Sequence, residues 1–148
     1  PANVGRNPKY QVDNLKFVDS TVTADAPEIK VEDGTTEILD GATTPISIGN
    51  ADVAATPPSK TFTVTNTGNQ ELTLGTPSVP ANYTITEPLA ASLAASASDT
   101  FTVEVGTATG GIYAGEISIV TNDADENPFN FAVTSNIGST EVEDWNER

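Results

Sequence analysis

Three segments of this chain alternate polar and apolar residues with a period of two, and this pattern restricts the fold more than any other feature. They are Thr61–Thr65 (Thr-Phe-Thr-Val-Thr), Thr100–Val105 (Thr-Phe-Thr-Val-Glu-Val) and Glu116–Ile119 (Glu-Ile-Ser-Ile). Successive side chains of an extended strand point to opposite faces of a sheet, so each segment has one apolar and one polar face. We therefore expect antiparallel strands with one face buried and the other in water.

Turn-forming residues separate these segments from further strand-like ones. Asn66–Asn69, Gly75–Pro77, Gly106–Gly111 and Asn122–Asp125 are rich in Gly, Asn, Asp or Pro. We expect strands near residues 28–32, 36–39, 45–48, 60–66, 70–75, 82–86, 99–105, 113–121 and 129–136. The sequence thus predicts an all-β fold, an immunoglobulin-like antiparallel β-sandwich of about 7–9 strands with extended N- and C-terminal segments.

The sandwich is expected to span residues 27–137 and to follow an N-terminal extension, residues 1–26. Within this extension, Tyr10–Val18 is apolar enough to form a strand. It is interpreted either as a strand donated to a neighbouring molecule or as the end of a preceding domain. The apolar residues of this possible donor strand are Tyr10, Val12, Leu15 and Phe17.

Residues 138–148 are expected to form an acidic tail or a linker to a following domain. They contain four acidic side chains and Trp145, the only tryptophan of the chain. A lone tryptophan in an acidic segment favours docking on another surface, so Trp145 is a candidate interaction residue. Because the chain opens on Pro1 rather than Met, we expect a processed product or a segment of a longer protein.

Missing residue types exclude most catalytic chemistry. The 148 residues include no Cys and no His, so the chain lacks a thiolate nucleophile, an imidazole base and the usual zinc ligands. Its net charge of −15 repels nucleic-acid phosphates and anionic lipid headgroups. No segment approaches the roughly 20 apolar residues of a membrane span. We predict a protein that is not an enzyme, binds no nucleic acid and does not insert into a membrane.

The pattern also resembles a known family. The stretch Lys60–Leu74 (Lys-Thr-Phe-Thr-Val-Thr-Asn-Thr-Gly-Asn-Gln-Glu-Leu-Thr-Leu) resembles the opening of bacterial choice-of-anchor D repeats, relatives of the ASPM, SPD-2 and hydin immunoglobulin-like domains. Gly111–Phe131 is similar to that family's closing hairpin, and Pro27–Val31 to its beginning. A proline that often ends the strand before the family's Gly-Tyr-Gly turn is absent, since Val105–Thr107 stands there. The resemblance implies a module of large secreted or surface-anchored bacterial proteins, without catalytic residues.

Asp123, Asp125 and Asn127 alternate in a loop between two expected strands. Alternate oxygen-bearing side chains can converge on one Ca²⁺ ion, which takes six to eight oxygen ligands. The glycine and the bidentate glutamate of an EF-hand loop are missing. The same residues also form ordinary turns, in which Asp and Asn cap their own backbone. Both a calcium site and a plain turn remain open at this point.

The aromatic residues are assigned by their place in the pattern. Tyr113 follows a Gly-rich turn, where it is either a tyrosine corner bonded to nearby backbone or an exposed sugar-stacking ring. Tyr83, near a loop, is the better candidate for an exposed ring. The remaining aromatic residues of the sandwich are expected in the core: Phe62, Phe101, Phe129 and Phe131.

Three functions follow from these observations. The first is a non-catalytic structural or interaction module of an extracellular or cell-surface protein, whose partners are neighbouring domains or copies of itself. The second is a self-assembling subunit of an extracellular filament, joined by N-terminal strand addition. The third is a carbohydrate-binding accessory module, which would bind polysaccharide through Tyr83, Tyr10 and Trp145.

Overall fold

The alternating segments become strands of two packed sheets. The computed structural model describes residues 25–138, and every regular element within them is a strand. The strands are β1 (Ile29–Asp33), β2 (Thr36–Ile38), β3 (Ala42–Ser47), β4 (Ala51–Asp52), β5 (Ser59–Asn66), β6 (Leu72–Thr73), β7 (Tyr83–Glu87), β8 (Ser92–Leu93), β9 (Ser98–Val105), β10 (Gly111–Ile119) and β11 (Phe129–Gly138).

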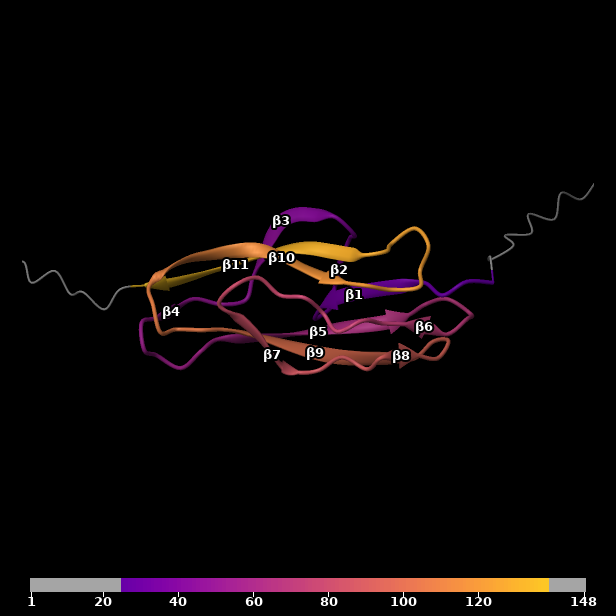
Figure 1. Cartoon of the computed structure of the whole chain (residues 1–148), viewed down its shortest axis with the longest axis horizontal. Coiled ribbons are helices and arrows are strands. Elements are labelled where there is room, and N and C mark those ends of the chain that lie inside the picture. The colour runs from indigo at the N-terminus through magenta and orange to yellow at the C-terminus, as the bar shows by residue number, and fades with distance from the viewer. Residues whose placement is uncertain (1–24, 139–148) are drawn as a thin grey trace, which may run out of the picture.

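Two sheets pack face to face (Figure 1). The first, sheet A, has the order β2-β1-β5-β9-β7, and all its neighbours are antiparallel. The second, sheet B, has the order β10-β11-β3, and the short β4 also pairs with β11. Strands β6 and β8 form a separate two-stranded ladder. The all-β, immunoglobulin-like sandwich expected from the sequence is confirmed.

Aromatic rings fill the space between the sheets. Phe62 of β5 lies 5.3 Å from Phe101 of β9, measured between ring centroids, and 5.1 Å from Phe131 of β11. The Phe129 ring lies 6.3 Å from that of Phe131. All four side chains are at most 1% exposed, which confirms their assignment to the core. Phe62 is therefore the ring that joins the two layers.

The structure corrects two details of the expected sandwich. Strands β3 and β4 run parallel to β11, so sheet B is not wholly antiparallel. The cause is the corner at residues 39–41, which carries the chain from sheet A to sheet B, with Gly41 at a φ of 68°. There are also eleven strands rather than about nine, because β4 and β8, each only two residues long, were not expected. Among residues 25–138 no helix is long and apolar enough to cross a membrane.

Candidate functional site

One side of the sandwich is partly closed by main-chain bonds. The segment between β6 and β7 runs along the outer edge of β10. There the N–H of Gly75 donates to the carbonyl of Val120 over 2.7 Å, and Ser78 and Ser118 exchange two bonds of 2.8 and 3.0 Å. Farther along the same edge, a Cβ placed on Gly115 would lie 2.5 Å from the Pro80 Cβ, so β10 and this segment are in close contact. This segment covers the edge of β10 from Gly115 to Val120, while β7, the end strand of sheet A on the same side, has β9 as its one ladder partner among the described residues.

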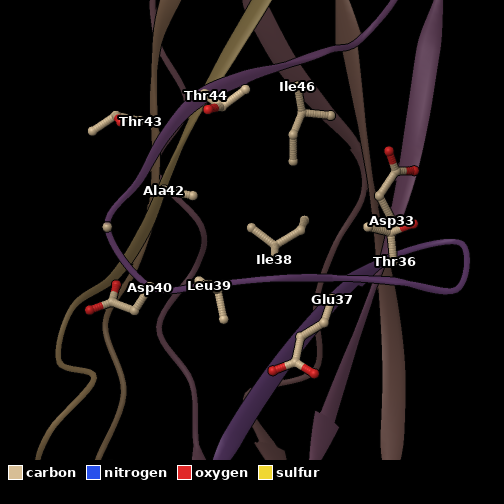
Figure 2. A pocket seen from close by; sticks show the side chains of 11 residues that line it. Asp33, Thr36, Glu37, Ile38, Leu39, Asp40, Ala42, Thr43, Thr44 and Ile46 are labelled. Atoms are coloured by element: carbon tan, nitrogen blue, oxygen red, sulfur yellow. The ribbon is translucent and has the colours of Figure 1, made fainter.

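The opposite side of the sandwich is open. Strand β2 ends sheet A and β3 ends sheet B, and within residues 25–138 neither has a second neighbour. A groove of about 560 Å³ lies between these two edges. Figure 2 shows Ile38 and Ile46 pointing toward one another across it. The groove is lined by Asp33, Thr36, Glu37, Ile38, Leu39, Asp40, Gly41, Ala42, Thr43, Thr44 and Ile46.

The groove has an apolar floor and an acidic rim. Ile38 is buried, whereas Ala42 and Ile46 are only half-buried and Leu39 is 69% exposed. The rim carries the exposed carboxylates of Glu37 and Asp40. Such a surface fits an extended segment that offers apolar side chains on one face and basic ones beside them.

The two edges differ in their capacity to accept a strand. Pro45 lies within β3 and has no N–H to donate, which is a common way to blunt an edge strand. Strand β2 contains no proline. Residues Thr36–Ile38 therefore offer the main-chain groups for an added strand, while β3 contributes the apolar wall.

Sequence reasoning missed this groove, although one sign of it was present. Ile38 and Leu39 are adjacent, and neighbouring residues of a strand point to opposite faces. One of them must therefore be exposed when the other is buried. The local pattern does not show which two strand edges lie next to each other, because that depends on pairing between residues distant in sequence.

A second candidate site lies in the loop before β11. Carboxylate oxygens of Glu28, Asp123 and Asp125 lie within 4.8 Å of one another. Asp123 is 2% exposed, and its Oδ2 accepts a hydrogen bond of 2.9 Å from the Ile29 N–H. Desolvation and the charges of the two aspartates raise the pKa of Glu28. The structure thus brings together two of the three residues expected to bind calcium and adds Glu28, which no local sequence signal marked.

Asn127 has a different role in this loop, since it bonds to the backbone. Its Oδ1 accepts a hydrogen bond of 3.2 Å from the Thr121 N–H, and the Asp123 N–H donates to the Thr121 hydroxyl over 2.9 Å. These are the backbone-capping bonds of an ordinary turn. The turn interpretation of the loop is therefore supported, and calcium binding stays a prediction.

Glu126 adds a fourth carboxyl group to the loop. Its Oε2 is buried and has no hydrogen-bond partner among the described residues. Burial, then the nearby charge of Asp123, raises the pKa of Glu126 to about 7. The folded state therefore holds a proton on Glu126 that the unfolded chain releases at a lower pH.

This difference predicts how Glu126→Gln changes the pH dependence of stability. A carboxyl whose pKa is raised on folding stabilises the protein below its unfolded pKa of 4.5, and that contribution is lost as the pH rises toward 7. We expect Glu126→Gln to leave stability near pH 4 unchanged and to increase it by about 1–2 kcal/mol at pH 8. Urea unfolding of both proteins from pH 4 to pH 8 measures this. Glu116→Gln, an exposed change of the same charge, is the control, and parallel pH curves for Glu126→Gln and wild type would contradict the prediction.

Of the two tyrosines assigned from the sequence, Tyr113 lies where it is expected and Tyr83 does not. The Tyr113 hydroxyl donates to the Thr109 carbonyl, four residues upstream, over 2.8 Å, which confirms the corner. The expectation of an exposed Tyr83 ring is wrong, since this residue is only 5% exposed. Its hydroxyl donates to the Tyr113 carbonyl over 2.9 Å. Tyr83 begins β7 and faces inward because its hydroxyl finds this partner at the rim of the core.

The remaining predicted site residues lie outside the described residues. These are the possible donor-strand residues Tyr10, Val12, Leu15 and Phe17, and Trp145 of the acidic segment.

Comparisons with known proteins show the fold and no closer relationship. The chain matches no family model and no curated protein. Among solved structures it is similar to the ASH/PapD-like domain 7 of human CEP192, with 11% identity, a TM-score of 0.57, and coverage of 90% of this chain and 100% of that one. A protein of unknown function from Porphyromonas gingivalis W83 has 14% identity, a TM-score of 0.56, and coverage of 82% and 51%. These likenesses support an immunoglobulin-like β-sandwich fold for the chain.

A further likeness is partial. The Vibrio cholerae VesB protease is similar over 64% of this chain, with 16% identity and a TM-score of 0.48. The chain spans 30% of that protease's length and about half of the Porphyromonas protein's. A match this short and distant says nothing about proteolysis by the present chain.

Proposed function

We propose that this chain is a non-catalytic structural and interaction module of an extracellular or surface-anchored bacterial protein. It would bind extended polypeptide segments in the groove between β2 and β3. The observation that carries this proposal is the contrast between the two sides of the sandwich. On one side main-chain bonds cover part of the β10 edge, while the other side leaves the edges of β2 and β3 open with an apolar groove between them.

Residue chemistry supports the absence of catalysis. The chain has no His or Cys to act as base or nucleophile. Glu28 and Asp125, two of the three clustered carboxylates, are exposed, and the third, Asp123, is held by the Ile29 N–H. The surface is strongly acidic and the fold is that of PapD-like domains. These features, with the resemblance to choice-of-anchor D repeats, favour a secreted or surface location.

Titration with synthetic ten-residue strand peptides, followed by NMR, tests the binding site. The isotope-labelled full chain carries Leu15→Asp and Phe17→Asp, so that its own possible donor strand does not occupy the groove. One peptide alternates apolar and basic residues, the second alternates apolar and acidic residues, and the third is a scrambled basic peptide. We expect the alternating basic peptide to shift the amide signals of residues 36–46, because the groove rim is acidic. If none of the peptides shifts these signals, the groove is not a binding site for extended segments.

Polysaccharide binding and calcium binding rank below this proposal. A polysaccharide-binding role is less favoured, because Tyr83 is buried and offers no platform for a sugar ring.

Calcium binding by the loop at residues 123–127 stays a prediction. A site there would raise the melting temperature in millimolar CaCl₂ at pH 7.5, and Asp125→Asn would remove that increase. An identical melting temperature with and without CaCl₂ would leave only the turn.

A further inference from the structure

We propose that the groove between β2 and β3 accepts residues 10–18 of a second copy of this chain, which joins copies into a filament. The inference rests on the proposed function, namely that this groove binds extended segments. It goes further by naming the segment and by making the partner another copy of the same chain.

The segment has the residues that the groove requires. In Tyr10–Val18, Leu15 and Phe17 share one face of an extended strand, with Lys16 on the other. Two apolar side chains of this size match the half-buried floor formed by Ala42 and Ile46. Main-chain groups of the added strand would pair with the free edge of β2.

Charge provides the second argument. Arg6, Lys9 and Lys16 are three of the six basic residues in the chain. Residues 25–138 contain only Lys30 and Lys60, and both are already paired, with Glu32 over 2.8 Å and with Asp33 over 2.7 Å.

Asp33, one of the carboxylates that line the groove, is thus paired with Lys60, and Lys30 lies near Glu37. Within the described part of the chain, Glu37 and Asp40 form no salt bridge. Residues 10–18 carry one acid, Asp13, and one base, Lys16, so the segment itself is neutral. Its complementarity to the acidic rim lies in Lys16 and in the preceding Arg6 and Lys9.

Chain geometry favours a neighbour's segment over the molecule's own. Ile38 at the end of β2 pairs with Val31 in β1, so β2 runs back toward the end of the sandwich where β1 begins. A strand antiparallel to β2 runs away from that end. Its own chain would then have to return along the sandwich to Asp25, by about 25 Å if eight extended residues lie beside the groove. The seven steps from residue 18 to Asp25 reach about that distance only when fully extended, whereas a segment from another copy has no such restriction.

The two ends of the described chain also suit a linear assembly. The beginning of β1 and the end of β11 lie toward opposite ends of the long axis (Figure 1). Strand β11 has ten residues and spans about 33 Å of this axis. Copies linked through an N-terminal segment would follow one another along a fibre.

Light scattering of the full chain and two complementary variants tests the inference. Wild type is expected to grow well beyond its monomer mass of 15.3 kDa as its concentration rises from micromolar to millimolar. A donor variant, Leu15→Asp with Phe17→Asp, keeps the groove but loses the apolar face. An acceptor variant, Leu39→Asp, changes a side chain that is 69% exposed and should not affect folding. Each variant alone should remain monomeric, whereas an equimolar mixture should form pairs and nothing larger.

A charge exchange provides an independent readout. Lys16→Glu and Glu37→Lys should each raise the concentration for half-assembly about tenfold, and a chain carrying both changes should regain most of the loss. The control is Ile112→Asp, a change on β10 at a side chain that is 77% exposed, which should assemble like wild type.

The outcomes separate this inference from the proposed function. A full chain that stays monomeric at millimolar concentration, or assembly that persists in the donor variant, overturns the inference. If the basic peptide nevertheless shifts residues 36–46, the groove remains a binding site for another segment. If neither assembly nor peptide binding occurs, both are wrong.

Discussion

Replacing Asn66, the last residue of β5, with alanine is expected to destabilise the folded chain by about 3–4 kcal/mol. The side chain is 0% exposed and makes four hydrogen bonds. Its Oδ1 accepts from the N–H groups of Glu28 and Gly68 over 3.3 and 3.0 Å, and its Nδ2 donates to the carbonyls of Gln70 and Leu93 over 2.7 and 3.0 Å. Alanine would leave these buried groups without partners. Thermal and urea unfolding should show a melting temperature lower by about 10–15 °C.

Two matched variants show whether the hydrogen bonds cause this loss. Asn66→Asp keeps the shape but turns the two donated bonds into contacts between oxygens, so it should destabilise the protein at least as much as alanine at pH 7. Asn69→Ala, three residues away, removes bonds in an exposed place and should cost less than about 1 kcal/mol. Equal losses for Asn66→Ala and Asn69→Ala would contradict the prediction.

The sequence predicted the strands well because their signal is local. Thr61–Thr65 and Thr100–Val105 alternate with a strict period, and both are central strands of sheet A. The phenylalanines of the core lie at apolar positions of such segments, so their burial follows from the same alternation. Agreement is weaker for β3, which begins at Ala42 rather than near residue 45, because an edge strand shows little alternation of burial.

The candidate sites were harder to predict because each joins residues distant in sequence. Asp123 and Asp125 were recognised as a pair, but Glu28 lies next to them only because the Ile29 N–H bonds to Asp123. Asn66 is expected both at the end of the strand 60–66 and at the start of a turn, and it is the last residue of β5. Nothing in Asn-Thr-Gly-Asn shows that its side chain also reaches Leu93. Tyr83 was expected outside because it follows a turn, and its partner is the carbonyl of Tyr113, thirty residues later.

The acidic residues have different environments at the two sites, exposed at the groove and partly buried in the loop before β11. At the groove, the carboxylates of Glu37 and Asp40 lie at the rim, in water, where their charge costs little and can select a basic segment. At the loop before β11, carboxylates are partly buried near one another, so Glu126 retains a proton up to about pH 7. The pH dependence of stability should therefore originate in the loop, and the salt dependence of assembly in the groove.

Phe62→Ala is expected to destabilise the protein by about 4 kcal/mol, because this ring is the one that touches aromatic rings in both sheets. The change would leave a cavity beside Phe101 and Phe131 in a core that is otherwise closely packed. Phe62→Leu keeps most of the volume and should cost about 1–2 kcal/mol. Urea unfolding of the full chain at pH 7 measures both, with the exposed Ile112→Ala as a control that should change stability by less than about 0.5 kcal/mol.

A double-mutant cycle identifies the contact between the sheets as the source of the loss. Phe62 and Phe131 are 5.1 Å apart with an interplanar angle of 64°, an edge-to-face arrangement that is favourable beyond the area it buries. If the contact holds the layers together, Phe62→Ala and Phe131→Ala should be non-additive by about 1 kcal/mol, since either change alone already removes the shared contact. Strictly additive losses would mean that each ring stabilises only its own sheet. The layers would then be joined by the other buried side chains of the core, and Phe62 would not be the ring that links them.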